Sequence, residues 1–232
     1  MMKKKLSVEI EDQLILDILD GKYRPGDSLP FERDLATNLN IGRPTLREAI
    51  QRLERDGFVT VRKGKATVVN DFWKTGTLNI LSKLASFGTH MSEEFIVHLL
   101  EFRVAIFPAM VFEAISDNAP LLVGSLAGID RISDSPEAYA NYDWKLQKSL
   151  ASLSKNPLYT LLLNSFDAVY TSLAAQYFST DRNRILSKKF YRELMEAAMK
   201  READRGERVS RKMMKESVVL WKNTRIQKGG GI

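Results

Sequence analysis

The fold of this chain is decided by residues 29–65, which read LPFERDLATNLNIGRPTLREAIQRLERDGFVTVRKGK. Two short amphipathic segments within it, 30–39 and 44–56, have the apolar spacing of helices and are separated by a break at Gly42. Gly57 follows the second segment and is a natural C-terminal stop for a helix. The stretch therefore predicts a pair of helices joined by a tight turn.

A hairpin is expected directly after these helices. Residues 58–61 and 66–69 alternate in the manner of paired strands, and Gly64 lies in the turn between them. The tip of this hairpin reads Arg62-Lys63-Gly64-Lys65, so it is strongly basic. Two helices followed by a basic hairpin indicate a winged helix-turn-helix, a module that places one helix in the major groove of DNA.

The remainder of the chain carries only helical patterns. An amphipathic helix is predicted over 7–20, before the deciding stretch, where it supplies one buried face. Further helices are predicted over 78–87, 92–115, 119–130, 136–153, 157–178, 182–204 and 206–226.

The expected fold class is therefore mainly α. Residues 1–71 are predicted to form the winged helix-turn-helix domain, and residues 72–78 are predicted to be a linker. Residues 79–228 are predicted to form an all-α bundle of about seven helices, large enough to enclose a core or a cavity.

Composition restricts the class of protein. The chain has 232 residues and no cysteine, which excludes disulfides and thiolate metal sites. The N-terminus turns acidic after one leucine, so no secretory signal is expected, and a cytoplasmic location is predicted. The most apolar stretch, Phe95–Ile115, is interrupted by charged residues; its longest uncharged run, 104–112, is too short to span a bilayer and predicts a buried core helix.

Individual basic residues, rather than bulk charge, point to DNA. The net charge is +6, but residues 1–72 hold 13 Lys/Arg against 12 Asp/Glu. Arg43 and Arg47 are four residues apart and share one face near the start of the second helix, beside Thr45. Arginine at this place can bond guanine O6 and N7 together. The same helix also carries three acidic residues, Glu48, Glu54 and Asp56. They must point away from DNA or pair with Arg52 and Arg55.

The remaining candidates surround that face. Arg33, in the first turn of the preceding helix, is expected to reach a base or a phosphate. At the wing tip, Gly64 lets the backbone approach DNA, while Lys63 and Lys65 suit phosphates or the minor groove. The alternative is that the module is structural and its arginines are only solvated.

The same string resembles the GntR family of bacterial transcription regulators. The shared features are LP-x-ER-x-LA, then G-R-x-T-L-REA-I-x-x-L, then a short strand that begins with glycine and an aromatic residue. The similarity covers residues 8–70 and implies that Arg33, Arg43, Thr45, Arg47 and Gly64 touch DNA. Pro44 departs from a more hydroxyl-rich turn and donates no hydrogen bond, which bears on fine sequence preference.

The second half resembles the fatty-acid-responsive members of that family. The matching segments, over residues 69–225, are VNDFWKTGTLNIL, LLEFRVAI, NPLYTLLLN, VYTSLAAQYF and ESVVLW. The resemblance implies a homodimer that binds a pseudo-palindromic operator and is released by long-chain acyl-CoA bound in the helical domain. It further implies repression of fatty acid degradation genes and activation of unsaturated fatty acid synthesis genes.

Arg103 is the main candidate in the effector half. It lies inside an apolar helix, where a guanidinium is costly without a partner. One interpretation is an internal salt bridge to Asp143 or Glu101; the other is an anion site for the ligand, which the resemblance favours.

The other candidates rest on spacing together with the resemblance. Tyr170 and Tyr177 are seven residues apart on one helical face, as core aromatics often are. The resemblance implies that both lie in the wall of the ligand pocket. Ser217 and Trp221 match positions beside the ligand, and Met213 and Met214 stand where the relatives carry a tyrosine and a glycine. The expected acyl-CoA site is Leu100, Arg103, Tyr170, Tyr177, Met214, Ser217 and Trp221.

Residues 182–225 hold 14 Lys/Arg and six Asp/Glu. They form either solvated helix faces or an attractor for the phosphates of CoA.

Catalytic and metal chemistry is not expected. Many related regulators bind a metal through one Asp and three His, but this chain has only His90 and His98. No catalytic triad, paired-carboxylate or phosphate-loop signature stands out, so neither an enzyme nor a cofactor is predicted. Two rival functions remain: a GntR regulator of a different small molecule, and a helical lipid- or acyl-carrier-binding module whose DNA-binding role is vestigial.

Overall fold

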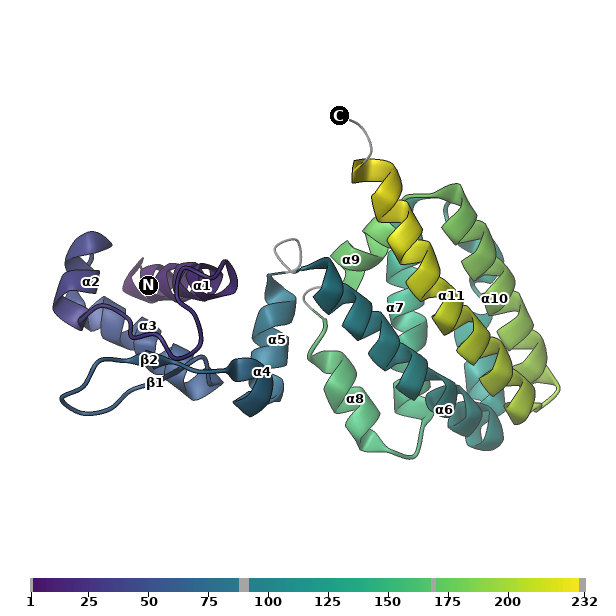
Figure 1. Ribbon diagram of the computed structural model, residues 1–232. Coiled ribbons are helices and arrows are strands. Elements are labelled where there is room, and N and C mark those ends of the chain that lie inside the picture. The colour runs from purple at the N-terminus through teal and green to yellow at the C-terminus, as the bar shows by residue number, and fades with distance from the viewer. Residues whose placement is uncertain (1, 88–91, 168–169, 230–232) are drawn as a thin grey trace. The chain divides into compact units, whose positions relative to one another are not determined.

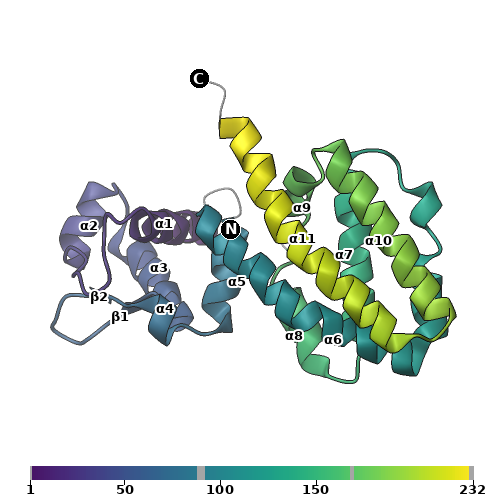
Figure 2. The same cartoon turned by 45° about the vertical axis from the view of Figure 1, so that its right-hand side comes forward.

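The computed structural model describes residues 2–87, 92–167 and 170–229. The chain folds into two compact units, Met1–Leu84 and Ala85–Ile232, and each is described by itself. The first contains the winged module, and the second is a helical bundle (Figures 1 and 2). The fold is mainly helical with one two-stranded antiparallel sheet in the described residues, as the sequence predicts.

The first unit packs its core between the first and third helices. Helix α1 spans Met2–Leu19 and lies against α3, Arg43–Asp56, while α2, Glu32–Asn38, covers the end of α3 (Figure 1). The side chains between them are fully buried because the apolar residues recur at helical spacing: Leu14, Ile15, Leu46, Leu53 and Phe58.

Local sequence explains the limits of α3. Pro44 lies in the first turn, where a missing N–H costs nothing. Gly57 adopts a left-handed φ of 94° and its N–H bonds the carbonyls of Leu53 and Glu54, which closes the helix. The predicted helix over 44–56 is thus confirmed.

The wing has shorter strands than predicted. Strand β1, Val59–Thr60, pairs antiparallel with β2, Val68–Val69, and the register joins Val59 to Val69. An isolated bridge joins Ser28 to Val68. Residues 61, 66 and 67 of the predicted strands 58–61 and 66–69 are not paired across the hairpin, and the Thr67 carbonyl instead accepts from the Leu29 N–H at 2.8 Å.

Residues 72–78, expected to be a linker, contain structured elements of the first unit. Helix α4 spans Phe72–Thr75, and α5 begins at Leu78 and ends at Ser86. Phe72 is buried, with its ring centroid 5.4 Å from that of Phe58. An aromatic side chain thus attaches this segment to the core under the wing.

The second unit is a bundle of four long helices with two short ones. Helix α11 lies along α6 and α10, α7 packs on α6, and the short α8 and α9 cover α7 (Figures 1 and 2). Its elements are α6 Glu93–Leu126, the 3-10 turn η2 Ile129–Arg131, α7 Pro136–Leu153, α8 Pro157–Asn164, α9 Tyr170–Tyr177, α10 Asp181–Met199 and α11 Ala203–Gly229.

Two differences from the predicted helices have physical causes. The segments 92–115 and 119–130 run together as α6, and the predicted break survives as a kink at Asn118, where φ is −137°, just before Pro120. The single helix predicted over 157–178 is wrong, because α8 ends at Asn164 and α9 starts at Tyr170. Between them, Asp167 accepts a 2.7 Å hydrogen bond from Trp144 Nε1 of α7. Asn164, Ser165 and Asp167 are also weak helix formers, so they favour a helix end at this place.

One helical stretch, Glu93–Arg131, is long and apolar enough to cross a membrane by length and composition alone. Core helices of soluble proteins have the same length and composition. In this unit, Phe107, Met110 and Val111 of α6 are almost completely buried in the bundle. The environment of these residues is that of a core helix, which the interrupted apolar pattern predicted.

Candidate DNA-binding face and effector cavity

Three of the predicted DNA-reading arginines lie exposed at neighbouring helix starts. Arg33 is in the first turn of α2, and Arg43 and Arg47 are in the first turns of α3. Arg47 Nε lies 2.6 Å from Glu32 Oε2, and Arg33 Nε lies 3.0 Å from Asp34 Oδ1. The contact between Glu32 and Arg47 therefore brings the start of α2 beside the first turns of α3, and all three arginines are exposed.

Thr45 does not share this exposure through its side chain. It is only 8% exposed, because position 45 belongs to the stripe of α3 that packs inward with Leu46 and Ala49. Its backbone N–H lies in the first turn, where helix amides have no intrahelical partner. A phosphate contact from Thr45 would therefore come from the main chain.

Two acidic residues of α3, Glu54 and Asp56, have hydrogen-bond partners within the protein. Asp56 accepts from Arg55 Nε at 2.7 Å, and Glu54 Oε1 accepts from the Val61 N–H at 3.0 Å. Arg52 turns to α1 instead, where its Nη1 lies 3.5 Å from Glu11. These contacts hold Glu54 and Asp56 at the end of the helix away from Arg43.

The wing tip is exposed and tightly turned. Gly64 has a φ of 73°, which side chains rarely adopt, and the Lys65 N–H bonds the Arg62 carbonyl at 3.0 Å. Lys63 and Lys65 both face solvent. The turn thus presents two ammonium groups around a glycine that leaves the backbone accessible.

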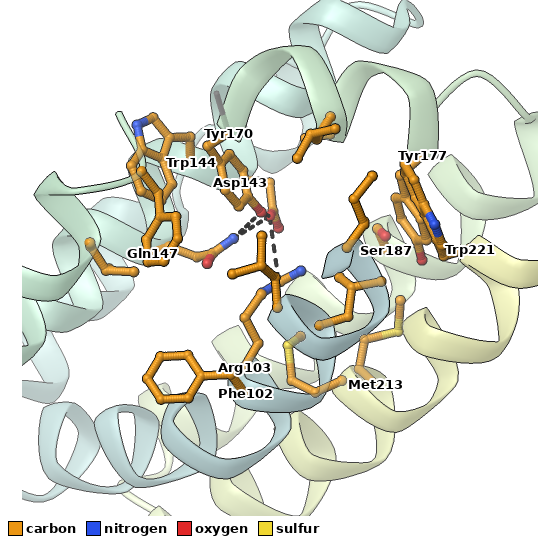
Figure 3. Close-up of a pocket in the computed structure, with 18 of the residues that line it drawn as sticks. Phe102, Arg103, Asp143, Trp144, Gln147, Tyr170, Tyr177, Ser187, Met213 and Trp221 are labelled. Carbon is orange, nitrogen blue, oxygen red and sulfur yellow. Dashed lines mark hydrogen bonds and ion pairs between the residues drawn. The ribbon is translucent and has the colours of Figure 1, made fainter. Parts of the chain in front are cut away.

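A cavity of about 100 Å3 lies inside the helical bundle (Figure 3). Side chains from α6, α7, α8, α9, α10 and α11 line it, and most of them are apolar. Six predicted ligand residues lie in its wall: Leu100, Arg103, Tyr170, Tyr177, Met214 and Trp221.

Ser217 is the predicted ligand residue that the structure does not bring to the wall. It is 5% exposed, and its hydroxyl donates to the Met214 carbonyl at 2.7 Å. A serine one turn after a carbonyl often bonds back to the helix in this way. Met213, by contrast, lines the cavity together with Met214.

A buried polar cluster forms one side of the cavity (Figure 3). Asp143 of α7 accepts from Gln147 Nε2 at 2.6 Å, from the Tyr170 hydroxyl and, at 2.6 Å, from the Tyr191 hydroxyl. Arg103 Nη2 of α6 lies 3.9 Å from Asp143 Oδ2. Of the two partners expected for an internal salt bridge, the structure selects Asp143, whereas Glu101 is exposed.

Arg103 is only partly satisfied by this cluster. Its Nε has no hydrogen-bond partner among the described residues, and its ion pair is at the outer limit of contact. The guanidinium carbon lies 5.9 Å from the Phe107 ring and 5.8 Å from the Tyr170 ring, which gives cation–π support. Arg103 therefore retains donors for an acceptor in the cavity.

Burial fixes the protonation of the phenols. It raises the pKa of Tyr170 and of Tyr191 well above the usual value, and the nearby Asp143 carboxylate raises both further. Burial also raises the pKa of Tyr177, whose hydroxyl lies near Ser187 on the far wall (Figure 3). The tyrosines are hydrogen-bond donors at neutral pH.

Among the lining residues that sequence reasoning missed, two are uncharged polar residues, Gln147 and Ser187. Gln147 lies four residues after Asp143 and donates both to it and to Tyr170. A polar pair at this spacing in a helix with buried aromatics was a usable signal. Ser187 of α10 gave none, because a single serine in a charged helix is unremarkable in sequence.

Many basic residues of α10 and α11 already have partners. Arg205 pairs with Glu196 and Glu202, and Arg211 pairs with Glu207. Such ion pairs are typical of solvated helix faces, which is the first of the two interpretations given for residues 182–225.

Metal ligands do not gather in the described part of the chain, where no three His, Cys, Asp or Glu residues are grouped to hold an ion. His98 is exposed on α6. His90 lies outside the described residues.

Comparison with known proteins assigns both units. Residues 6–69 match the family of bacterial regulatory proteins called gntR, and residues 70–228 match the FadR C-terminal domain. The fatty acid metabolism regulator protein of Shewanella halifaxensis is 36% identical over 215 residues, covering 93% of this chain and 90% of the relative. Its counterpart in Pasteurella multocida is 34% identical over 213 residues, covering 92% and 88%.

A solved structure of the Listeria monocytogenes protein Lar shares the fold. Its TM-score is 0.61 at 18% identity, and the match covers 93% of this chain and 96% of that one. The family matches and the relatives span nearly the whole sequence. The chain thus belongs to the GntR family of bacterial transcription regulators, in the group that carries a FadR C-terminal domain.

Proposed function

We propose that this regulator controls fatty acid metabolism as a homodimer and leaves its operator when long-chain acyl-CoA fills the helical cavity. It would act in the cytoplasm, repressing degradation genes and activating unsaturated fatty acid synthesis genes. The family assignment and the names of the relatives support the metabolic role.

The observation that carries the effector is the cavity. Its wall is apolar over most of its area, as an acyl chain requires, and one side holds Arg103 with an unsatisfied Nε. A buried cation next to an apolar lining suits an amphipathic ligand with polar or anionic groups. The metal–carboxylate sensing of other relatives has no ligand set among the described residues.

Release follows from differential binding. Two winged units of a dimer would read half-sites about one helical turn apart. The ligand must bind the non-DNA-binding state more tightly, since equal affinity for both states shifts nothing. Because Met213 and Met214 lie in the wall where smaller or different side chains occur in the resembled members, we expect the acyl-length preference to differ.

The test is fluorescence anisotropy with a labelled pseudo-palindromic duplex at a stated salt concentration. Long-chain acyl-CoA is titrated in, with free CoA and free fatty acid as controls. Release by acyl-CoA alone supports the proposal. Tight binding that acyl-CoA leaves unchanged retains the DNA-binding role but removes the effector, and favours a GntR regulator of a different small molecule.

Trp221 gives a residue-level check of the cavity. It is 3% exposed and lines the wall, so Trp221→Ala should leave operator binding intact and weaken acyl-CoA release. Because truncating a buried tryptophan also costs about 3–5 kcal/mol of stability, Trp221→Phe serves as the folded control. An unchanged response to acyl-CoA in both variants would remove Trp221 from the site.

A further inference from the structure

Glu32 lies beside Arg47, and the two side chains form an ion pair. Glu32 is the first residue of α2, and its carboxylate crosses to α3, where Oε2 lies 2.6 Å from Arg47 Nε. The side chain of Arg47 is 63% exposed and that of Glu32 is 35% exposed. An ion pair this exposed adds little to stability, so its effect must be sought elsewhere.

The atom that Glu32 occupies restricts how Arg47 can bind. A guanidinium has five N–H donors in a rigid fork, and two of its edges can make bidentate bonds. Because Nε is held by Glu32, the edge that combines Nε with one Nη is blocked. Only the end-on pair, Nη1 and Nη2, remains free for guanine or phosphate oxygens.

The charge of Glu32 has a second consequence. A carboxylate among the basic residues of the face repels phosphates at every DNA sequence alike, which lowers the affinity for every duplex. At the correct site, the oriented Arg47 recovers free energy from a base edge, which it cannot do elsewhere. The specificity ratio therefore depends on how Glu32 orients Arg47, because the repulsion acts equally on both kinds of duplex.

We propose that Glu32 is a positioning residue that sets sequence discrimination by holding Arg47 for end-on readout. The inference rests on the DNA-binding role of the family and is independent of the effector. Arg47 is the residue expected to touch DNA; Glu32 acts through it.

The experiment compares Glu32→Gln and Glu32→Ala with the full-length wild-type chain. Wild type first selects its preferred site from randomised duplexes; affinities for that site and for an unrelated duplex are then measured over a range of salt. We expect Glu32→Gln to bind the unrelated duplex more tightly and to lower the specificity ratio about tenfold, within the range of one base contact. Glutamine keeps an acceptor for Nε, so Glu32→Ala should relax the base preference further.

Glu48→Gln is the matched control. Glu48 is an exposed carboxylate on α3 with no ion pair in the described residues, so its removal should raise both affinities equally and leave the ratio unchanged. In an Arg47→Ala background, Glu32→Gln should no longer alter base preference. An unchanged ratio in Glu32→Gln, or an equal fall in Glu48→Gln, overturns the proposal.

The outcomes distinguish failure of operator binding itself from failure of the role proposed for Glu32. Failure of wild type to select any duplex would overturn the operator itself. A clear wild-type preference that Glu32→Gln retains overturns the role of Glu32 alone. The effector is absent from this test, so the outcome of acyl-CoA titration does not affect it.

Discussion

Arg47 of the DNA-binding face and Arg103 of the effector cavity each lie near one carboxylate, but their surroundings differ. The Arg47 side chain is 63% exposed and 2.6 Å from its partner, whereas the Arg103 side chain is 19% exposed and 3.9 Å from Asp143. The two Nη groups of an exposed arginine can exchange water for a phosphate with little change in free energy. A buried guanidinium with a free donor gains much more from an incoming acceptor, because it has no water to bond.

The difference in burial gives arginine a different task at each of the two sites. On the exposed surface, arginine supplies a reversible contact whose strength depends on salt and on the base it meets. Inside the bundle, Arg103 Nε has no hydrogen-bond partner among the described residues, so an acceptor that entered the cavity would form a strong bond with it. The predictions below test whether these two settings are as distinct as the structure indicates.

The largest effect should come from Arg43→Ala on the exposed face. Arg43 has no ion pair in the described residues and lies at the first position of α3, where recognition helices meet bases. A bidentate guanine contact is worth about 1–3 kcal/mol, and a dimer would lose two, so specific binding should disappear. Anisotropy with specific and unrelated duplexes measures the loss, and circular dichroism checks the fold. Retained sequence preference would exclude the base contact.

In the cavity, Asp143→Ala should instead reduce stability. The variant leaves Arg103 without a counter-charge and deprives Gln147, Tyr170 and Tyr191 of their acceptor. Removing one partner from a buried pair costs about 3–5 kcal/mol. Urea unfolding measures this cost.

The control for Asp143 is Asp130→Ala. Asp130 also pairs with a cation, Arg192 at 2.6 Å, but its side chain is 75% exposed. This variant should cost much less stability than Asp143→Ala. Equal losses from the two variants would contradict the proposed distinction between buried and exposed pairs.

Helix packing around the cavity gives a third test, through Gly206→Ala in α11. A Cβ at this position would lie 2.3 Å from Ile115 Cδ1 and 3.1 Å from Val111 Cγ1 of α6. We expect a loss of about 1–3 kcal/mol from overpacking, although alanine is the better helix former. Thermal or urea unfolding measures the change.

Gly124→Ala is the matched control, because Gly124 of α6 has nothing within 4 Å of an added Cβ. It should be neutral or stabilising by up to about 1 kcal/mol. A Gly206→Ala variant as stable as Gly124→Ala would mean that the Ile115 side chain moves aside at little cost.

The two regions also differ in how far sequence could predict them. Helix α3 was found almost to the residue, because Gly42, Pro44 and Gly57 are local signals for its start and stop. Thr45 shows the limit: it stands between two exposed arginines in sequence, but its side chain faces the core. Inward or outward orientation at the edge of an apolar stripe depends on packing that spacing does not specify.

The cavity was harder to predict from sequence, because contacts between separate helices form it. Spacing placed Tyr170 and Tyr177 on one face, yet the continuous helix predicted there was wrong, because α8 ends at Asn164 and α9 begins only at Tyr170. Gln147 and Ser187 meet the cavity only because α7 and α10 pack around it. A polar site assembled from several helices leaves little trace in any one segment.

The smallest predicted effect sharpens the comparison within the exposed face itself. Lys63 is exposed at the wing tip, where an ammonium group suits a phosphate and carries little sequence information. Lys63→Ala should weaken binding to specific and unrelated duplexes by the same factor. It should also reduce the slope of log affinity against log salt by about 0.9 for each phosphate that the side chain no longer neutralises.

Lys65→Ala should behave in the same way, because it lies on the other side of Gly64 in the same turn. Arg43→Ala should behave differently. It should change the ratio of the affinities for specific and unrelated duplexes more than it changes the salt slope. If Lys63→Ala lowered the ratio instead, the wing would read bases in the minor groove. Discrimination would then be shared between the wing and α3, and the division between reading and anchoring residues would have to be redrawn.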